Sequence, residues 1–328
     1  MRGQRNFLRL AIMAWSIMLL SLYPFQVFGQ DFPTKPITIY CGQEAGATTD
    51  LTGRALAEIA KTQLGVPVVV ENKPGGGQTV AAALVATKKP DGYTLACIGS
   101  SALFTRHMML KVPYDPFKDF TYILAYGNYI GGICVKETSP FKSLKDLLEH
   151  ARKNPGSLTY SSSGTGSSMQ LAVEYLAKQA NVEYKHVPYK GGAPATTALI
   201  GGHVDFTAGA GIHLNYVKQG IFRMLAVTVA DMRDPDFPDI PTLKDLGYKD
   251  LPPPRFLLVG PKGLPDTVFK KIDTAFRQAA HSHEFKKVLK NLSVPFVYKG
   301  RHEMEADFPK EYQFYANLLK EMGIKTRK

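Results

Sequence analysis

Short apolar segments rich in β-forming residues alternate with helical segments along most of the chain. Residues 37–41 and 66–70 are typical of strands, and residues 51–64 between them repeat their apolar side chains at helical spacing. The pattern returns later, where 158–161 precedes a helical stretch over 168–180. Strands that are apolar throughout are buried on both faces. The alternation therefore predicts an α/β fold with mostly parallel sheets flanked by helices.

The length and charge of the chain exclude other classes of protein. The 328 residues include 40 Lys and Arg against 28 Asp and Glu, a formal net charge of +12, and 45% are hydrophobic. That hydrophobic content excludes a disordered chain, and the length suits about two domains. The positive charge suits nucleic acid, an acidic surface or small anions. Because no Lys/Arg run and no nucleic-acid motif occurs, we favour small anions.

The first residues have the features of an export signal. Three arginines fall within the first nine residues, residues 10–25 carry no charge, and small residues follow at Val27 and Gly29. We predict that residues 1–29 are a secretory signal peptide cleaved near Gly29. An uncleaved membrane anchor is the alternative. The apolar run, residues 10–25, has 16 residues and is shorter than the ~20 that a membrane-spanning helix needs.

The three cysteines, Cys41, Cys97 and Cys134, each lie in a short apolar run. In an oxidising compartment an odd number permits one disulfide and one free thiol. Three small buried core residues are the simpler interpretation. No Cys-x-x-Cys pair is present, so nothing in the sequence supports a structural zinc site.

The first loop that joins a predicted strand to a predicted helix spans residues 43–50. Its small residues let the backbone approach a ligand, and Thr48 and Thr49 place hydroxyl groups beside the helix start. The free N–H groups and the dipole at a helix start favour an anion. An ordinary helix cap by Thr49 or Asp50 explains the same residues without a ligand.

Residues 161–168 form a second loop of this kind, and all eight are Ser, Thr or Gly. Between a strand and a helix such a run forms a nest of uncharged donors for an anion, although a linker has a similar composition. Residues 72–78 suggest a nucleotide site, but the Gly-x-Gly-x-x-Gly pattern breaks at Val80 and no Gly-x-x-x-x-Gly-Lys-Ser/Thr occurs. We interpret this third loop as a tight structural turn.

Signatures of enzymes are scarce. No Gly-x-Ser-x-Gly elbow occurs, and His302-Glu303 lacks the second histidine of a zinc pair. We therefore expect no catalytic residue, no metal and no cofactor. A secreted hydrolase that uses a serine of residues 161–168 is the alternative from another class. It requires a base and an orienting acid, which the sequence does not place.

Several ordered segments resemble those of one protein family. They include Val-Glu-Asn-Lys-Pro-Gly at 70–75, Pro-Asp-Gly-Tyr-Thr-Leu at 90–95, Pro-Tyr-Asp-Pro at 113–116, Val-Pro-Tyr-Lys-Gly at 187–191 and Gly-Gly-His-Val-Asp at 201–205. From about Phe32 to the C-terminus the chain resembles the substrate-binding proteins of tripartite tricarboxylate transporters, often called Bug proteins.

The resemblance implies a two-lobed periplasmic-binding-protein fold, a type II-like clamshell whose lobes are mostly parallel sheets flanked by helices. Residues 30–129 with 254–328 would form lobe 1, and residues 130–253 lobe 2. A proline-rich connector, residues 234–265, leads back to lobe 1 and holds 8 of the 22 prolines.

The implied function is that of a monomeric periplasmic receptor. It would capture a small carboxylate in the cleft and deliver it to a membrane permease with one large and one small subunit. A receptor that senses a ligand for a membrane signalling partner would use the same clamshell and stays an alternative.

The ligand-binding candidates lie in the two loops, after the third strand and in later segments that face the cleft in this family. They are Gln43, Glu44, Ala45, Gly46, Thr48, Thr49, Ser100, Ser101, Ser162, Ser163, Gly164, Thr165, Gly166, Ser167, Ser168, Tyr189, Gly191, Asp205 and Arg255.

This chain departs from the family pattern at three places. Gly42, Gln43 and Glu44 stand where the family commonly has Pro, an aromatic and a small residue, and Gln170 stands where it often has His. A carboxylate at Glu44 would repel an anionic ligand unless it pairs with a ligand amine, so we expect an amino or otherwise polar carboxylate. Arg255 replaces a frequent Trp, and it either grips a carboxylate or is a solvated surface residue.

Overall fold

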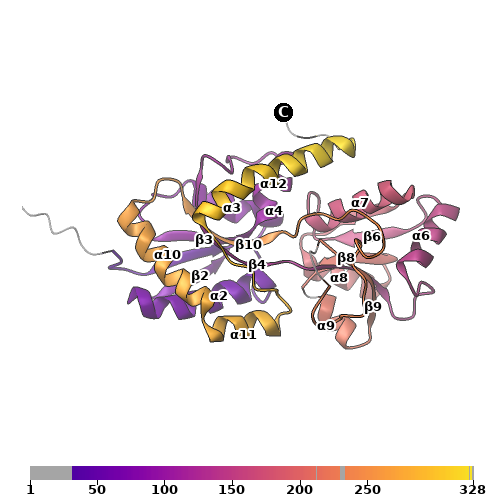
Figure 1. The fold of residues 1–328 in the computed structure, drawn as a ribbon, viewed down its shortest axis with the longest axis horizontal. Coiled ribbons are helices and arrows are strands. Elements are labelled where there is room, and N and C mark those ends of the chain that lie inside the picture. The colour runs from indigo at the N-terminus through magenta and orange to yellow at the C-terminus, as the bar shows by residue number, and fades with distance from the viewer. Residues whose placement is uncertain (1–31, 212, 230–232, 325, 327–328) are drawn as a thin grey trace, which may run out of the picture. The chain divides into compact units, whose positions relative to one another are not determined.

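The structure, a computed structural model, describes residues 32–211, 213–229, 233–324 and 326 (Figure 1). The predicted signal peptide, residues 1–29, lies outside the described residues. Lys35–Lys328 form one unit that contains two β-sheets flanked by helices. We call the six-stranded sheet with its helices the first lobe, and the five-stranded sheet with its helices the second lobe.

The first lobe has the strand order β11-β4-β10-β3-β1-β2. Its strands are β1 (Ile37–Cys41), β2 (Val68–Asn72), β3 (Thr94–Gly99), β4 (Phe120–Asn128), β10 (Arg255–Pro261) and β11 (Lys299–Gly300). Its helices are α2 (Thr48–Leu64), the 3₁₀ turn η1 (Gly76–Gln78), α3 (Thr79–Ala86), α4 (Ser100–Leu103), α5 (Thr105–Met109), α10 (Asp266–His281), α11 (His283–Asn291) and α12 (Arg301–Glu321).

The second lobe has the strand order β7-β6-β8-β5-β9. Its strands are β5 (Gly131–Lys136), β6 (Thr159–Ser162), β7 (Lys185–Pro188), β8 (Phe206–Ala210) and β9 (Phe222–Thr228). Its helices are α6 (Leu144–Lys153), α7 (Ser168–Ala180), α8 (Gly192–Gly201) and α9 (His213–Lys218).

Both sheets are mixed, which corrects the expectation of mostly parallel sheets within the predicted α/β fold. β1 runs parallel to β2 and β3, and β6 runs parallel to β7 and β8. β10 lies antiparallel between β3 and β4, and β5 lies antiparallel between β8 and β9. The chain leaves the first sheet after β4, and β10 brings it back. Alternation of strands and helices in the sequence indicates parallel strands. It does not give the direction of β5 and β10, each of which follows a connection between the two sheets.

The sequence explains where the two helices that follow the candidate loops begin and end. α2 buries Leu56, Ala60 and Leu64 on one side and ends at Leu64, followed by Gly65, whose left-handed φ of 70° favours glycine. It begins at Thr48, earlier than apolar periodicity predicts, because the first turn is polar. α7 starts after Ser167, whose side chain accepts the N–H of Gln170 as a regular N-cap.

Three elements differ from the sequence expectations. The long strand β4 was not predicted, although nearly all of it is buried in the first sheet. β10 lies inside the proline-rich segment, so that segment is only partly a connector. A proline inside a helix usually kinks or breaks it, yet α12 continues through Pro309, because a proline removes one backbone donor without ending a helix held by its packing.

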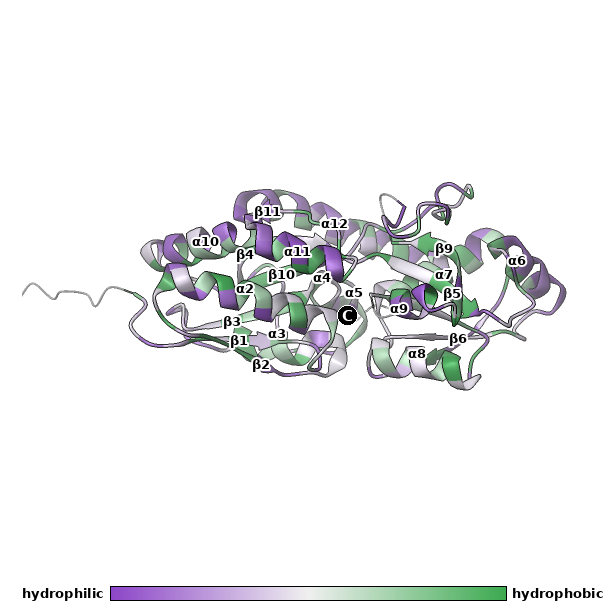
Figure 2. Ribbon diagram, turned by 90° about the horizontal axis from the view of Figure 1, so that it is seen from below, coloured by the Kyte–Doolittle hydropathy of each residue, from purple (hydrophilic) through white to green (hydrophobic). Residues whose placement is uncertain are grey.

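The cores lie on the apolar strands and the inward sides of the helices. Cys41, Cys97 and Cys134 are free and buried in them, which agrees with the simpler interpretation of these residues. Figure 2 shows largely hydrophobic colour on β9 and hydrophilic colour on much of α6. Within the described residues, no helix is long and apolar enough to cross a membrane, and no cluster of His, Cys, Asp or Glu is arranged to hold a metal ion.

Candidate functional site

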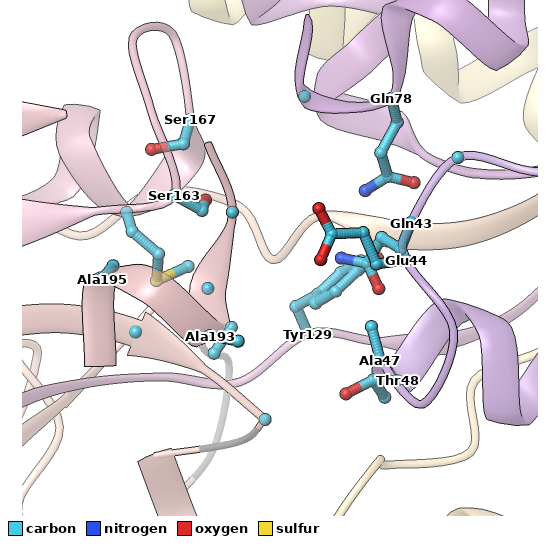
Figure 3. A pocket seen from close by; sticks show the side chains of 18 of the residues that line it. Gln43, Glu44, Ala47, Thr48, Gln78, Tyr129, Ser163, Ser167, Ala193 and Ala195 are labelled. Carbon is cyan, nitrogen blue, oxygen red and sulfur yellow. The ribbon is translucent and has the colours of Figure 1, made fainter. Parts of the chain in front are cut away.

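A cavity of about 360 Å³ is lined by loops of both lobes (Figure 3). This volume falls in the range of sites for small organic molecules. The first lobe contributes the β1–α2 loop, the turn around η1 and α5. The second lobe contributes the β6–α7 loop, the start of α8 and the end of β8. The cavity therefore lies where strand ends and helix starts of the two lobes meet.

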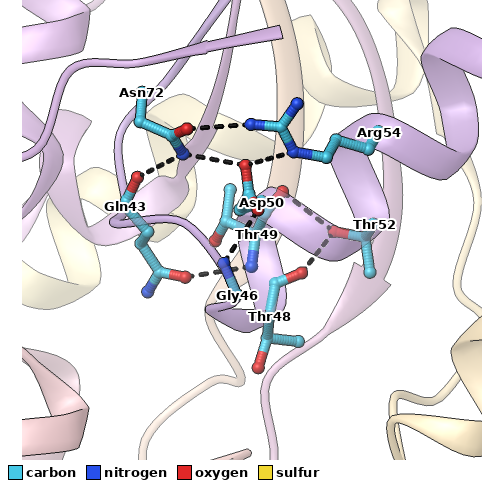
Figure 4. A network of polar contacts seen from close by, with 8 residues as sticks. All are labelled: Gln43, Gly46, Thr48, Thr49, Asp50, Thr52, Arg54 and Asn72. Atoms are coloured by element: carbon cyan, nitrogen blue, oxygen red, sulfur yellow. Dashed lines mark hydrogen bonds and ion pairs between the residues drawn. The ribbon is translucent and has the colours of Figure 1, made fainter.

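A polar network fixes the β1–α2 loop (Figure 4). Asp50 is buried, accepts the Gly46 N–H at 2.9 Å and pairs with Arg54 Nε at 2.9 Å. The Asn72 amide donates to Asp50 at 2.8 Å and to the Gln43 carbonyl at 2.9 Å. Burial alone would raise the pKa of Asp50, but these hydrogen bonds and Arg54 outweigh burial and lower it. The loop is thus held by an ionised carboxylate that does not line the cavity.

The two threonines at the start of α2 have different surroundings. Thr49 is fully buried, its N–H donates to the Gln43 side chain at 2.9 Å, and its hydroxyl contacts the Tyr129 hydroxyl at 2.7 Å. Thr48 lines the cavity. A Cβ built on Gly211 of the second lobe would lie 2.6 Å from Thr48 Oγ1, so this hydroxyl meets the facing lobe directly. Gln43 therefore caps the helix, and Thr48 is the hydroxyl available to a ligand.

The β6–α7 loop combines an internal framework with serines that line the cavity. Ser162 is fully buried and its hydroxyl contacts His186 Nε2 at 2.7 Å and Ser167 Oγ at 3.3 Å. The Gly166 N–H donates to the Gln170 side chain at 2.8 Å. Ser163, Ser167 and Ser168 line the cavity. Ser162 and Gln170 therefore shape the loop that presents these serines.

Arg106, on α5, is a buried cation in the wall of the cavity. It is 4% exposed, and its Nη2 donates to the Ser163 carbonyl at 3.1 Å. Its Nε has no hydrogen-bond partner, and no carboxylate of the described residues forms an ion pair with it. Burial lowers the pKa of Arg106 to about 10, against smaller upward effects of Tyr129 and Tyr114. The guanidinium is thus still charged at pH 7 and lacks an acidic partner within the described chain.

Glycine in the η1 turn makes room for this guanidinium. A Cβ built on Gly77 would lie 1.2 Å from Arg106 Nη1, and Gly77 has a φ of +62°. A side chain here would occupy the place of the guanidinium. The Asn72–Gln78 segment, interpreted from sequence as a structural turn, therefore also shapes the cavity.

The geometry matches a known family. The family described as "Tripartite tricarboxylate transporter family receptor" matches residues 52–323. The chain belongs to this family. Its members are periplasmic solute-binding receptors and not enzymes, which confirms the expectation of a binding protein.

Relatives and solved structures cover nearly the whole receptor. The "UPF0065 protein in gbd 5'region" of Cupriavidus necator is 36% identical over 302 residues, 92% of each chain. The structure of the periplasmic binding protein BugD is 27% identical, with a TM-score of 0.82 over 90% of this chain and 99% of that one. An R. palustris protein determined with adipate is 27% identical, with a TM-score of 0.83 and the same coverage. These similarities confirm the predicted two-lobed fold.

The cavity brings together part of the predicted site. The predicted residues that line it are Gln43, Glu44, Ala45, Gly46, Thr48, Ser101, Ser163, Ser167, Ser168 and Gly191. The predicted residues that do not line it are Thr49, Ser100, Ser162, Gly164, Thr165, Gly166, Tyr189, Asp205 and Arg255.

Several of the residues outside the lining have structural partners instead. The Asp205 carboxylate accepts the Thr159 N–H at 2.7 Å and its hydroxyl at 2.8 Å, at the start of β6. Ser100 accepts the Arg255 N–H at 3.0 Å. The Arg255 side chain forms a buried ion pair with Glu311 of α12, so it is neither a cavity residue nor a solvated one.

Sequence reasoning missed other residues of the cavity wall. Besides Arg106 and Gly77, they include Gln78, Tyr129, Met169, Lys190 and Asn215. Lys190 belongs to the Val-Pro-Tyr-Lys-Gly segment and Gln78 to the third loop, so position in a strand-to-helix loop was a usable signal for both. Tyr129 lies between β4 and β5, where the chain passes from the first lobe to the second. Because β4 was not predicted, this crossing was not located from the sequence.

The Ser162–His186 contact bears on the hydrolase alternative. A serine hydroxyl at 2.7 Å from an imidazole nitrogen resembles a nucleophile and its base. However, Ser162 is fully buried, does not line the cavity and shares its hydroxyl with Gly164. Together with membership of a receptor family, this position assigns the pair to the framework of the loop.

Proposed function

We propose that this receptor captures a small carboxylate in the cavity between its lobes and delivers it to a two-subunit membrane permease of the tripartite tricarboxylate type. The buried Arg106 guanidinium is the observation that carries this proposal. A charge that is buried without a partner is unfavourable, and a ligand carboxylate would supply the missing partner. Arginine also has the planar geometry that pairs with a carboxylate through two hydrogen bonds.

The remaining ligand contacts would come from small residues of both lobes. Thr48 from the first lobe and Ser163, Ser167 and Ser168 from the second offer hydroxyl groups around the cavity. Ser168 is buried, and its hydroxyl lies close enough to Tyr315 to affect the pKa of that phenol. A ligand that contacts Thr48 of the first lobe and the serines of the second lobe favours closure of the two lobes, because it makes all of these contacts only when the lobes are close together.

The proposal extends to export and to lobe boundaries. The periplasmic family supports the prediction that residues 1–29 are removed as a signal peptide. The division into residues 30–129 with 254–328 and residues 130–253 draws support from the strands, because β5 to β9 share one sheet and the other strands share the second. The permease is proposed from the family description alone.

A thermal-shift screen tests the proposed function. The full chain is expressed, purified after export and mixed with mono-, di- and tricarboxylates, each paired with its uncharged amide. An acid at ~100 times its dissociation constant stabilises a protein by about 2.7 kcal/mol. We expect a shift of several degrees for at least one acid and none for its amide. Equal shifts with acid and amide, or no shift with any acid, would contradict the proposal.

Substitution of Gly77 by Ala is expected to weaken binding of the tightest acid of this panel at least tenfold, measured by calorimetry. The new methyl group would take the place of Arg106 Nη1, so the guanidinium would have to move. Gly65→Ala is the matched control, because Gly65 has a φ of +70° and no atom within 4 Å of its built Cβ. Both variants should lose about 1 kcal/mol of stability from the left-handed backbone, and Gly77→Ala should lose more because the guanidinium is displaced. Similar affinities in both variants would show that the space at Gly77 is not needed for binding.

A further inference from the structure

The wall of the cavity contains charged side chains of both signs. Among the described residues that line it, those with a formal charge at pH 7 are Glu44, Arg106 and Lys190. Arg106 is buried against Gly77 and Ser163, and Lys190 lies in the loop between β7 and α8 of the second lobe. Glu44 lies in the β1–α2 loop of the first lobe. Two cations and one anion leave this lining with a formal charge of +1.

Glu44 has the geometry of a residue that contacts the ligand. Figure 3 shows its carboxylate pointing from the β1–α2 loop toward the second lobe, on the side where Ser163 lies. Its backbone carbonyl accepts the Ala47 N–H at 3.2 Å, which holds the loop. Its exposed carboxylate forms no ion pair or hydrogen bond with any described residue. This carboxylate is therefore available to a group that enters the cavity.

Glu44 and Arg106 do not neutralise each other. No ion pair joins them, and the titratable groups close enough to affect the pKa of Arg106 are the phenols of Tyr129 and Tyr114. A plain dicarboxylate that reached Arg106 would bring negative charge into the same small cavity as Glu44, and like charges repel there more strongly than in bulk water. A ligand with a positive group beside its carboxylate would meet attraction at both residues.

We propose that the ligand carries an ammonium group that pairs with Glu44, while one of its carboxylates pairs with Arg106. This inference rests on the proposed function and narrows its ligand class to amino-substituted carboxylates. A ligand with two carboxylates and one ammonium group has a net charge of −1, which complements the +1 of the cavity lining. In that ligand the second carboxylate would approach Lys190.

Three pairs of acids that differ only in an amino group test the inference: aspartate and succinate, glutamate and glutarate, 2-aminoadipate and adipate. Dissociation constants are measured by calorimetry with the exported protein. We expect the amino acid of at least one pair to bind tenfold or more tightly than its plain partner. In Glu44→Gln this preference should fall below threefold, because the side chain keeps its size but loses the charge.

Glu58→Gln is the matched control, since Glu58 is an exposed residue of α2 outside the cavity lining. It should retain the preference of the unsubstituted receptor. Plain acids that bind as tightly as their amino partners, or a preference that survives in Glu44→Gln, would overturn the inference and leave the proposed function standing. If no acid of the wider panel binds, the proposed function fails and this inference fails with it.

Discussion

Replacement of Arg106 by Met is expected to weaken carboxylate binding by about a hundredfold or more while the free receptor keeps or gains stability. Removal of one partner from a buried charged pair costs a complex about 2–5 kcal/mol. In the free receptor, which has no ligand carboxylate, the charge of Arg106 lowers the stability. Burial lowers the pKa of Arg106 to about 10, so at every pH below that value, including pH 7, the charged guanidinium disfavours the folded state.

Met has an unbranched stem like that of Arg, and exchange of a buried charge for an apolar side chain is often neutral or stabilising by about 1–4 kcal/mol. Loss of the hydrogen bond to the Ser163 carbonyl would offset part of this gain. Calorimetry with the tightest acid of the panel and thermal unfolding without ligand measure the two effects. Arg277→Met, at an exposed position of α10, serves as the control and should change neither. A variant that binds normally but unfolds many degrees lower would make Arg106 a purely structural residue.

Replacement of Glu311 by Ala is expected to destabilise the receptor by about 3–5 kcal/mol, the usual effect of leaving one buried charge without its partner. The side chains of Glu311 and Arg255 are only 7% and 13% exposed and form an ion pair between α12 and β10. The Arg255 guanidinium also lies 5.8 Å from the centre of the Phe308 ring. Burial raises the pKa of Glu311, and the attraction of Arg255 offsets part of that effect. The midpoint of thermal unfolding should fall by on the order of 10 °C.

The double variant Arg255→Met with Glu311→Leu separates pairing from packing. Since it removes both charges, it should recover most of the lost stability, and the cycle that it forms with the single variants Arg255→Met and Glu311→Leu gives the coupling energy. Affinity for the carboxylate should stay within about threefold, because neither residue lines the cavity. A double variant as unstable as Glu311→Ala would show that the packing at α12, and not the ion pair, is the stabilising feature.

The two arginines show what the sequence does and does not disclose. Arg255 drew attention because it stands where the family often has Trp, but its partner Glu311 lies 56 residues later in α12. Pairing across that separation is decided by the docking of α12, which local periodicity does not describe. Arg106 lies in a five-residue helix with no distinctive pattern, and only the meeting of α5 with the β6–α7 loop makes it a cavity residue.

The loops themselves were predictable for a local reason. A strand followed by small polar residues and a helix places donors at one edge of a sheet, so Thr48, Ser163 and Ser167 reach the cavity as expected. Which hydroxyl turns inward depends on single hydrogen bonds. The Gln43 side chain accepts the Thr49 N–H, and the Tyr129 hydroxyl forms a hydrogen bond with the Thr49 hydroxyl. Thr48 is therefore the threonine that lines the cavity. Such choices between neighbours follow from the packed structure and not from spacing.

A crystal structure of the receptor with the tightest acid of the panel would test the central claim most directly. The account predicts one carboxylate of that acid in the cavity between the lobes, with its oxygens about 2.7–2.9 Å from the Arg106 guanidinium nitrogens. A hydroxyl of the β6–α7 loop should lie within hydrogen-bond reach of the same acid. An acid bound outside the cavity, or inside it with Arg106 untouched, would contradict the account.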